Sequence, residues 1–165
     1  MAAAAKTNAM RALDQRGVPY EALVYSTSDE FKTAVEVASL LGLPPDQVYK
    51  TIVVLSDGGA RYLVMVAAHR EIDLKLLARS AEEKRLRLAS LKEAESLTGL
   101  RVGCISALAL LGRPFTPLLD RPAATLEHIV VSAGQRGQQI RLVTTDLLAV
   151  TVARLVDATA ATPAG

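Results

Sequence analysis

Two segments rich in β-branched and aliphatic residues stand near the middle of the chain, at Val48–Leu55 and Arg61–Ala67. Both have the composition of β-strands. Between them lies Asp57-Gly58-Gly59, and glycine after aspartate is typical of a tight turn that joins antiparallel strands. The pattern therefore predicts a β-hairpin in this part of the chain.

Polar capping residues mark the starts of several helices. Thr33 with Glu36 and Ser90 with Glu93 have the S/T-x-x-E spacing of a capping box, in which each side chain accepts a hydrogen bond from the other residue's backbone N–H. The predicted helices are Thr7–Arg16, a second from Thr33 to Gly42, Leu74–Ser80 after the capping residue Asp73, a fourth from Ser90 to Thr98, and a last one that begins at Thr145 or Asp146.

Short apolar runs between glycines and prolines predict further strands. They are Pro19–Tyr25, Arg85–Leu88, Val102–Ile105, Phe115–Leu119, His128–Ser132 and Gln139–Val143. Strands outnumber helices and do not alternate regularly with them, which favours an α+β fold with a mixed, barrel-like sheet over a doubly wound fold. We expect a single domain over residues 1–157, followed by a flexible tail at 158–165.

Composition narrows the class of protein. The chain has 165 residues, half of them hydrophobic and 22% charged, which agrees with one globular domain and excludes wholesale disorder. Its single cysteine, Cys104, excludes a disulfide within the chain and a site built from several thiolates. With two histidines in no ligand pattern, a zinc site is not expected. A formal charge of +2 argues against a protein that coats nucleic acid, although local basic patches are compatible with it.

The first ten residues contain four alanines followed by Lys6, without the apolar stretch of a signal peptide. The longest apolar runs, such as Ala107–Leu111, are too short to span a bilayer. We therefore expect a soluble cytoplasmic protein that does not bind a membrane.

Lys50 stands at the start of the predicted strand Val48–Leu55, two residues before the strand becomes fully apolar. One interpretation is an ordinary lysine that faces solvent. The other is a lysine at the end of the sheet whose ammonium points into a cleft, where it could hold a phosphate or a carbonyl oxygen.

Two glycine-containing segments could present backbone N–H groups to a ligand. Ser132-Ala133-Gly134-Gln135-Arg136-Gly137 directly follows a predicted strand and is either a plain hairpin loop or a cradle for an anion or carbonyl. Gly103, within a predicted strand, indicates a bulge or a close approach of a ligand. Its neighbour Cys104 has apolar surroundings in the sequence and is expected to be a buried, inert thiol. Neither Ser106 nor Ser132 lies in the pattern of a nucleophile elbow.

Three segments in this order resemble the YbaK/EbsC group of the YbaK/ProX aminoacyl-tRNA deacylases, an editing family. They are Gly42–Thr51 (GLPPDQVYKT), Val102–Ser106 (VGCIS) and Val131–Gly137 (VSAGQRG). The resemblance extends over nearly the whole chain, from about Thr7 to Asp157, and implies a mixed barrel-like sheet flanked by helices. Family members hydrolyse the ester between a wrongly attached amino acid and tRNA, typically cysteine or alanine on the tRNA for proline.

The resemblance also assigns roles to residues. Lys50 matches the functional lysine of the family, and Gly103 matches the glycine whose backbone helps to position the substrate carbonyl. Ser132 and Gly134 match residues of the pocket loop, and Tyr25 falls where the family has its pocket tyrosine. Ser106, at the end of the glycine segment, is included among the substrate-binding residues. In the cysteine-specific branch the thiol of the substrate attacks its own ester, so the resemblance implies neither a protein nucleophile nor a cofactor.

The chain departs from the family pattern at two positions. Ala107 stands where a proline is common, and Gln139 replaces an acidic residue after the loop. The leading hypothesis is a trans-editing deacylase for Cys-tRNA(Pro) that grips the terminal aminoacyl-adenosine of tRNA and could act beside prolyl-tRNA synthetase. The alternatives are a deacylase for Ala-tRNA(Pro), a hydrolase of another small ester, and a non-catalytic module that binds an aminoacyl or nucleotide-like ligand.

Overall fold

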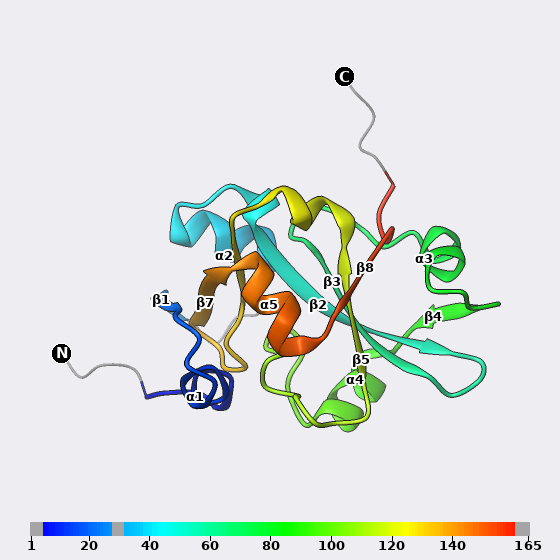
Figure 1. Cartoon of the computed structure of the whole chain (residues 1–165), viewed down its shortest axis with the longest axis horizontal. Coiled ribbons are helices and arrows are strands. Elements are labelled where there is room, and N and C mark those ends of the chain that lie inside the picture. Colours follow the sequence, from blue (N-terminus) through cyan, green and yellow to red (C-terminus); the bar gives the residue numbers. More distant parts are fainter. Residues whose placement is uncertain (1–4, 28–31, 161–165) are drawn as a thin grey trace, which may run out of the picture.

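A computed structural model describes residues 5–27 and 32–160. These residues form one mixed eight-stranded sheet and five α-helices, with two short 3-10 helices (Figure 1). The strands are β1 (Glu21–Val24), β2 (Val48–Ser56), β3 (Arg61–Ala67), β4 (Leu86–Leu88), β5 (Thr116–Asp120), β6 (His128–Ser132), β7 (Gln138–Val143) and β8 (Arg154–Val156). The α-helices are α1 (Asn8–Gln15), α2 (Ala34–Leu41), α3 (Leu74–Ser80), α4 (Leu91–Thr98) and α5 (Thr144–Thr151).

Strand order in the sheet is β1-β7-β6-β2-β3-β5-β8, with β4 added beside β2. Strands β2 and β3 form the predicted antiparallel hairpin, with Val53 opposite Leu63. Three neighbouring pairs are parallel: β2 with β6, β3 with β5, and β5 with β8. The mixed sheet flanked by helices is therefore confirmed, and among the described strands it runs as an open path from β1 to β8.

Side chains at the helix starts behave as the sequence predicts. Thr7 Oγ1 accepts a hydrogen bond from the Met10 N–H at the start of α1. Both capping boxes form, with Thr33 before α2 and Ser90 before α4. Each such cap satisfies backbone donors that have no partner within the helix, and it contributes about 1 kcal/mol. These local interactions explain why the helices begin where they do.

Strand β2 is central and apolar on both faces because two cores lie against it. Tyr49 and Val53 belong to a large core that also contains the inner residues of β6, β7 and α1. Val54 and the partly buried Ile52 pack in a second core, against α3 and Leu118 of β5. Burial on both sides is the reason that the run from Ile52 to Leu55 lacks the alternation of an exposed strand.

The structure differs from the sequence-based predictions at three places. Residues 102–105 do not form a strand: the Cys104 N–H donates to Arg101 O and closes a turn, with Gly103 at φ +92°. Strand β8 was not predicted at all, since its three residues carry no extended apolar pattern. Helix α5 also begins at Thr144, one residue earlier than expected, with no side-chain cap.

The chain beyond β8 is held in the fold at least as far as Thr159. Ala158 is fully buried, and its N–H donates to Asp120 Oδ1 at 2.9 Å. Thr159 is also buried, and its hydroxyl donates to the second oxygen of Asp120. The first residues of the predicted tail are thus packed, while 161–165 lie outside the described residues. No helix in the described ranges is long and apolar enough to cross a membrane.

Candidate functional site

A split in the sheet creates the candidate site. Strands β2 and β6 are paired only at Val48 with Val130 and at Tyr49 with Val131, after which they part. The opposite edge of β2 is covered by β3, and β4 joins β2 only from Val54 onward. Among the described strands, none therefore pairs with residues 50–52 of β2 on the edge that faces the split.

The backbone of Thr51 points into this gap. Val48 O accepts from the Ala68 N–H on the β3 side, and Val53 O accepts from the Ala89 N–H on the other side. Since backbone groups alternate between the two edges of a strand, Thr51 shares the orientation of Val53. No strand pairing or other backbone hydrogen bond to Thr51 on this edge occurs in the described part of the chain. Within residues 5–27 and 32–160, the N–H and C=O of Thr51 thus have no backbone partner on this edge.

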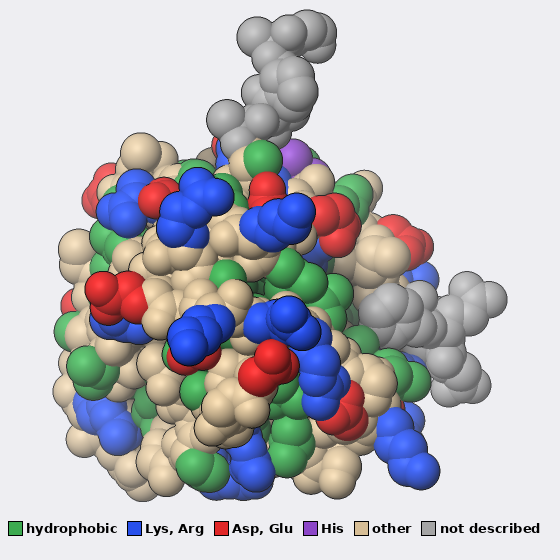
Figure 2. All heavy atoms as spheres, turned by 90° about the vertical axis from the view of Figure 1, so that its right-hand side faces the viewer, with side chains coloured by type: hydrophobic (Ala, Val, Ile, Leu, Met, Phe, Trp, Pro, Cys, Tyr) green, Lys and Arg blue, Asp and Glu red, His purple; other side chains and the backbone are tan. Residues whose placement is uncertain are grey.

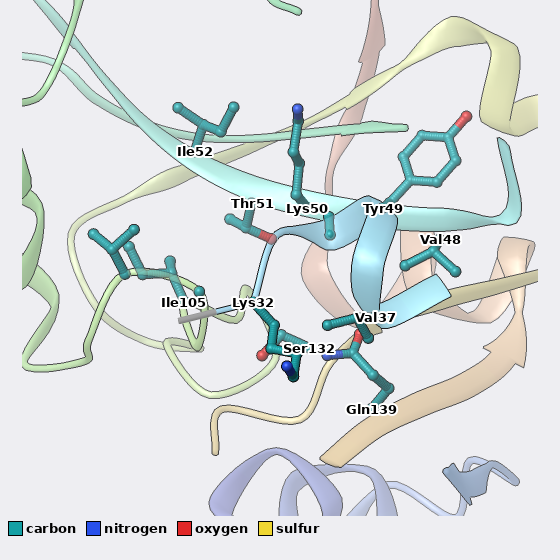
Figure 3. Close-up of a pocket in the computed structure, with 13 residues that line it drawn as sticks. Lys32, Val37, Val48, Tyr49, Lys50, Thr51, Ile52, Ile105, Ser132 and Gln139 are labelled. Carbon is teal, nitrogen blue, oxygen red and sulfur yellow. The ribbon is translucent and has the colours of Figure 1, made fainter. Parts of the chain in front are cut away.

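A pocket of about 150 Å³ occupies the split (Figure 3). Its walls come from the segment before and within α2, from β2, from the turn at Gly103, and from the ends of β6 and β7. The described residues that line it are Lys32, Ala34, Val37, Val48, Tyr49, Lys50, Thr51, Ile52, Val102, Gly103, Ile105, Ser132 and Gln139. A mostly apolar wall with a few polar groups is typical of a small-molecule site.

Lys50 lines this pocket, but its ammonium forms hydrogen bonds with residues that do not line the pocket. Lys50 Nζ donates to Ala68 O at 3.2 Å and to Glu71 Oε1 at 3.4 Å. Figure 3 shows the side chain extending away from Ser132 and Gln139. The Glu71 side chain is 89% exposed, and such ion pairs contribute about 0–1 kcal/mol, so an anionic ligand could replace Glu71 at little cost.

Gly103 lies at the top of the turn between Arg101 and Cys104, and it is exposed. Its φ of +92° is a conformation that residues with a Cβ rarely adopt, which explains the glycine. The Gly103 N–H has no backbone acceptor among the described residues. The turn thus brings Gly103 to the wall of the pocket, with an N–H that has no partner among the described residues.

Ser132 ends β6 and is the polar group on the opposite wall. Its Oγ accepts from the Gly134 N–H at 3.0 Å, which fixes the hydroxyl oxygen and leaves its proton free to be donated. Gln139 lies opposite Ser132 on β7, and Figure 3 shows its amide directed toward the pocket. Lys50, Gly103 and Ser132 thus all line one pocket, from β2, the turn and β6 respectively.

The other three predicted residues support the 132–137 loop and do not line this pocket. Gly134 has φ +87°, and a Cβ there would lie 3.1 Å from the Ala109 side chain and 3.8 Å from that of Ser106. Ser106 is buried, and its Oγ accepts from the Ala109 N–H. The Tyr25 N–H donates to Gly137 O at the far end of the loop. We assign these three residues to the shape of the loop rather than to direct contact in the pocket.

Thr51 and Lys32 line the pocket and were not singled out from the sequence. Thr51 Oγ1 is buried and has no hydrogen-bond partner in the described structure. An unsatisfied buried hydroxyl costs about 1–3 kcal/mol, so its presence points to a ligand that supplies the partner. The sequence does contain a signal for Thr51. Side chains alternate between the two faces of a strand, so this polar residue shares a face with the core residues Tyr49 and Val53.

Charge in the pocket is one-sided. Of the described lining residues two are lysines and none is acidic. Cys104 is buried beside the turn, and its pKa is raised by burial, which agrees with the predicted inert thiol. Over the described ranges no three His, Cys, Asp or Glu side chains are grouped to hold a metal ion. The site can therefore stabilise negative charge on a bound oxygen or sulfur through lysines and unpaired N–H groups.

Comparison with known proteins identifies the family to which the chain belongs. Residues 28–150 match the family model described as "Aminoacyl-tRNA editing domain". The chain is 33% identical over 155 residues to the "Putative Cys-tRNA(Pro)/Cys-tRNA(Cys) deacylase EbsC" of Enterococcus faecalis, and the match covers 93% of each protein. A segment of the proline–tRNA ligase of Staphylococcus aureus is 30% identical over 110 residues, which are 66% of this chain and 19% of the ligase.

Solved structures agree with the fold. A "putative trans-editing enzyme for prolyl tRNA synthetase" is 25% identical and superposes with a TM-score of 0.77, covering 96% of this chain and all of that one. The hypothetical protein APE2540 has a TM-score of 0.84 at 23% identity, over 93% of this chain and 99% of its own. The second likeness supports the fold alone.

Proposed function

Since the chain belongs to the aminoacyl-tRNA editing domain family, we propose that it is a trans-editing deacylase that hydrolyses the ester of Cys-tRNA(Pro). One observation carries the proposal: the split between β2 and β6 brings Lys50, Gly103 and Ser132 to a single pocket. The name of the Enterococcus relative supports cysteine as the amino acid, and it gives the tRNA for proline beside the tRNA for cysteine.

The size of the pocket suits the aminoacyl group. Its volume of about 150 Å³ equals that of engineered cavities that bind benzene, a ligand of about six non-hydrogen atoms. A cysteinyl group is of this size, whereas a nucleoside is far larger. The amino acid would therefore enter the split, and the terminal adenosine would remain at its mouth.

We assign the chemistry to the substrate thiol. The cysteinyl sulfur attacks its own ester carbonyl carbon, an S–C bond forms, and the bond from that carbon to the ribose oxygen breaks. The thiol proton is transferred to the departing ribose oxygen, and water later opens the cyclic thioester to free cysteine. Lys32, which lines the pocket, favours the thiolate, because a nearby cation lowers the pKa of a thiol. This route requires no nucleophile from the protein.

The protein would hold the reacting atoms. The unpaired N–H groups of Gly103 and Thr51 are placed to stabilise the oxyanion that develops on the carbonyl. Ser132 and Thr51 Oγ1 offer hydrogen bonds to the amino group or the ester oxygen. Lys50 would exchange Glu71 for the terminal nucleotide phosphate, as a compact point charge.

Partners follow from the substrate. The ligase of Staphylococcus aureus carries a similar segment within its own chain, which supports a role for this protein beside prolyl-tRNA synthetase. We propose that it acts on tRNA released by that enzyme, in the cytoplasm, where tRNA is charged.

Deacylation assays with tRNA(Pro) charged with cysteine, alanine or proline test this proposal. We expect rapid release of cysteine and little release of proline. S-methylation of the cysteinyl group should abolish release, because the attacking sulfur is blocked. Preferential release of alanine would favour direct attack by water instead, and no release above buffer with any substrate would favour a module that only binds.

A further inference from the structure

A second hollow lies beside the pocket and shares Val102 with it. It measures about 670 Å³ and is lined by Leu91, Glu95, Arg101, Val102 and Arg136. Leu91 and Glu95 come from α4, Arg101 and Val102 from the turn that carries Gly103, and Arg136 from the 132–137 loop. The same two loops that shape the pocket thus continue into this hollow.

Two arginines at this hollow are not neutralised by described residues. Neither Arg101 nor Arg136 makes an ion pair or a side-chain hydrogen bond within residues 5–27 and 32–160. Both arginines line the same hollow, Arg101 from the turn that carries Gly103 and Arg136 from the 132–137 loop. Their positive charge is therefore concentrated next to Gly103.

Two of the residues that line the hollow are apolar. Leu91 is 62% exposed, although it is a large hydrophobic residue, and Val102 is half-buried. In sites for single-stranded RNA, bases stack on aromatic side chains or guanidinium planes, and phosphates pair with basic groups. The hollow offers two guanidinium groups, and its apolar residues can contact the face of a base. The pocket is too small to hold more than the amino acid, so the nucleotides that precede it must lie outside and nearby.

We propose that this hollow binds the unpaired 3′ end of tRNA, with Arg101 and Arg136 on the backbone phosphates and Leu91 and Val102 against a base. The inference rests on the proposed function and extends it from the aminoacyl group to the nucleotides that precede the terminal adenosine. It also explains how a protein with a net charge of +2 can bind tRNA, since the charge is used locally.

Glu95 is the one acidic residue that lines the hollow among the described residues. Its carboxylate repels a bound phosphate and lowers the affinity for RNA. Glu95→Gln removes the negative charge with little change of shape. If the hollow holds a polyanion, this variant should bind RNA about two- to fivefold more tightly at low salt, and the gain should shrink as salt screens the charges.

The test compares the double variant Arg101→Ala/Arg136→Ala with Arg79→Ala/Arg85→Ala. The control pair removes the same charge from exposed residues at the end of α3 and just before β4, the side of the molecule where Figure 2 shows basic and acidic side chains interspersed. Two substrates are used, Cys-tRNA(Pro) and 3′-cysteinyl-adenosine. Binding of a fluorescent single-stranded RNA that ends in CCA is measured separately by anisotropy.

We expect Arg101→Ala/Arg136→Ala to raise KM for Cys-tRNA(Pro) about tenfold, with kcat nearly unchanged, and to leave cleavage of cysteinyl-adenosine as in the wild type. RNA binding should weaken by a similar factor, and the slope of log affinity against log salt should fall by about 1.4. The control pair should change neither.

Unchanged RNA binding in Arg101→Ala/Arg136→Ala would overturn the inference, whatever the activity. Equal loss of cleavage on both substrates would also contradict it, because the arginines would then act on the aminoacyl group. If the wild type cleaves neither substrate, the proposed deacylase function fails, while the anisotropy measurement still decides whether the hollow binds RNA.

Discussion

The pairs β2/β6 and β3/β5 are both parallel, but their ends differ. Strands β3 and β5 stay paired over four positions, from Tyr62 with Thr116 to Met65 with Leu119. At the carboxyl end of β5 the carboxylate of Asp120 is buried and accepts from Ala158 and Thr159. Strands β2 and β6 part after two positions, and beside their split Thr51 Oγ1 has no described partner.

The difference separates a structural end of a strand from a functional one. In the β3/β5 pair the chain itself supplies the hydrogen bonds, through the segment after β8. Beside the split of the β2/β6 pair, Thr51 Oγ1 has no partner in the described structure, and we propose that a ligand supplies it. A polar residue at the end of a strand therefore indicates a binding site only if its hydrogen-bond partners are also known. Variants at the β2/β6 end should lower activity, and variants at the β3/β5 end should lower stability.

Lys50→Ala should have the largest effect, and on activity. If the ammonium holds the substrate at the split, kcat/KM for Cys-tRNA(Pro) should fall about hundredfold. The free energy of unfolding should change by less than about 1 kcal/mol, because Glu71 is mostly exposed. Deacylation kinetics and urea unfolding measure the two quantities, with Lys84→Ala, an exposed lysine before β4, as the control. A variant with wild-type kcat/KM would remove Lys50 from the site.

Asp120→Ala should have the converse effect. It leaves the Ala158 N–H and the Thr159 hydroxyl buried without their acceptor, which should lower the free energy of unfolding by about 2 kcal/mol. Activity per folded molecule should stay at the wild-type level, since Asp120 does not line the pocket. If Asp120→Ala retains its stability but loses activity, the contrast between the two strand ends is wrong.

Thr51→Val tests the unsatisfied hydroxyl and keeps the shape of the side chain. Stability should stay equal or rise by up to about 1 kcal/mol, whereas kcat/KM should fall about tenfold if the hydroxyl binds substrate. Thr144→Val is the matched control, because Thr144 Oγ1 is also buried without a described partner but lies outside the pocket. It should gain similar stability at unchanged activity. Equal activity in both variants would show that Thr51 contacts no substrate.

Tyr49, the last paired residue of β2 before the split, gives the smallest effect. Burial, and next the charge of Asp120, raise its pKa from 10.0 to about 12. The raised pKa contributes stability that is fully present below pH 10 and is lost as pH rises through 12. Near pH 11 the wild type should have lost about 1 kcal/mol that Tyr49→Phe does not lose. Parallel curves of stability against pH would show that folding does not raise the pKa of Tyr49.

Local signals predicted most of the fold. The capping boxes at Thr33 and Ser90 and the hairpin at Asp57-Gly58-Gly59 act within a few residues, so the sequence shows them directly. Strand β8 was missed because its three residues become a strand only through β5, which is distant in sequence. The sequence predicts a strand around Gly103 because its neighbours are apolar. The hydrogen bond from the Cys104 N–H to Arg101 O, which forms a turn there, has no signal in that pattern.

The candidate site could be predicted only in part. The family resemblance singles out Lys50, Gly103 and Ser132, and all three line the same pocket. It could not show that Lys50 Nζ rests on Ala68 and Glu71, nor that Ser106 and Gly134 shape a loop instead of the pocket. Thr51 was not singled out because threonine is common in strands. What distinguishes it is its position just after the last residue of β2 that pairs with β6.

The most direct test of the split as the aminoacyl site is an NMR titration of backbone amides with a cysteinyl-adenosine analogue in which an amide replaces the ester. The Thr51 and Gly103 amides should show the largest shifts, because their N–H groups lack backbone partners in the described structure and would gain one from the ligand. Amides of the β3/β5 pair should stay in place. If the Thr51 and Gly103 amides show no chemical-shift change while other amides do, the split is not the aminoacyl site.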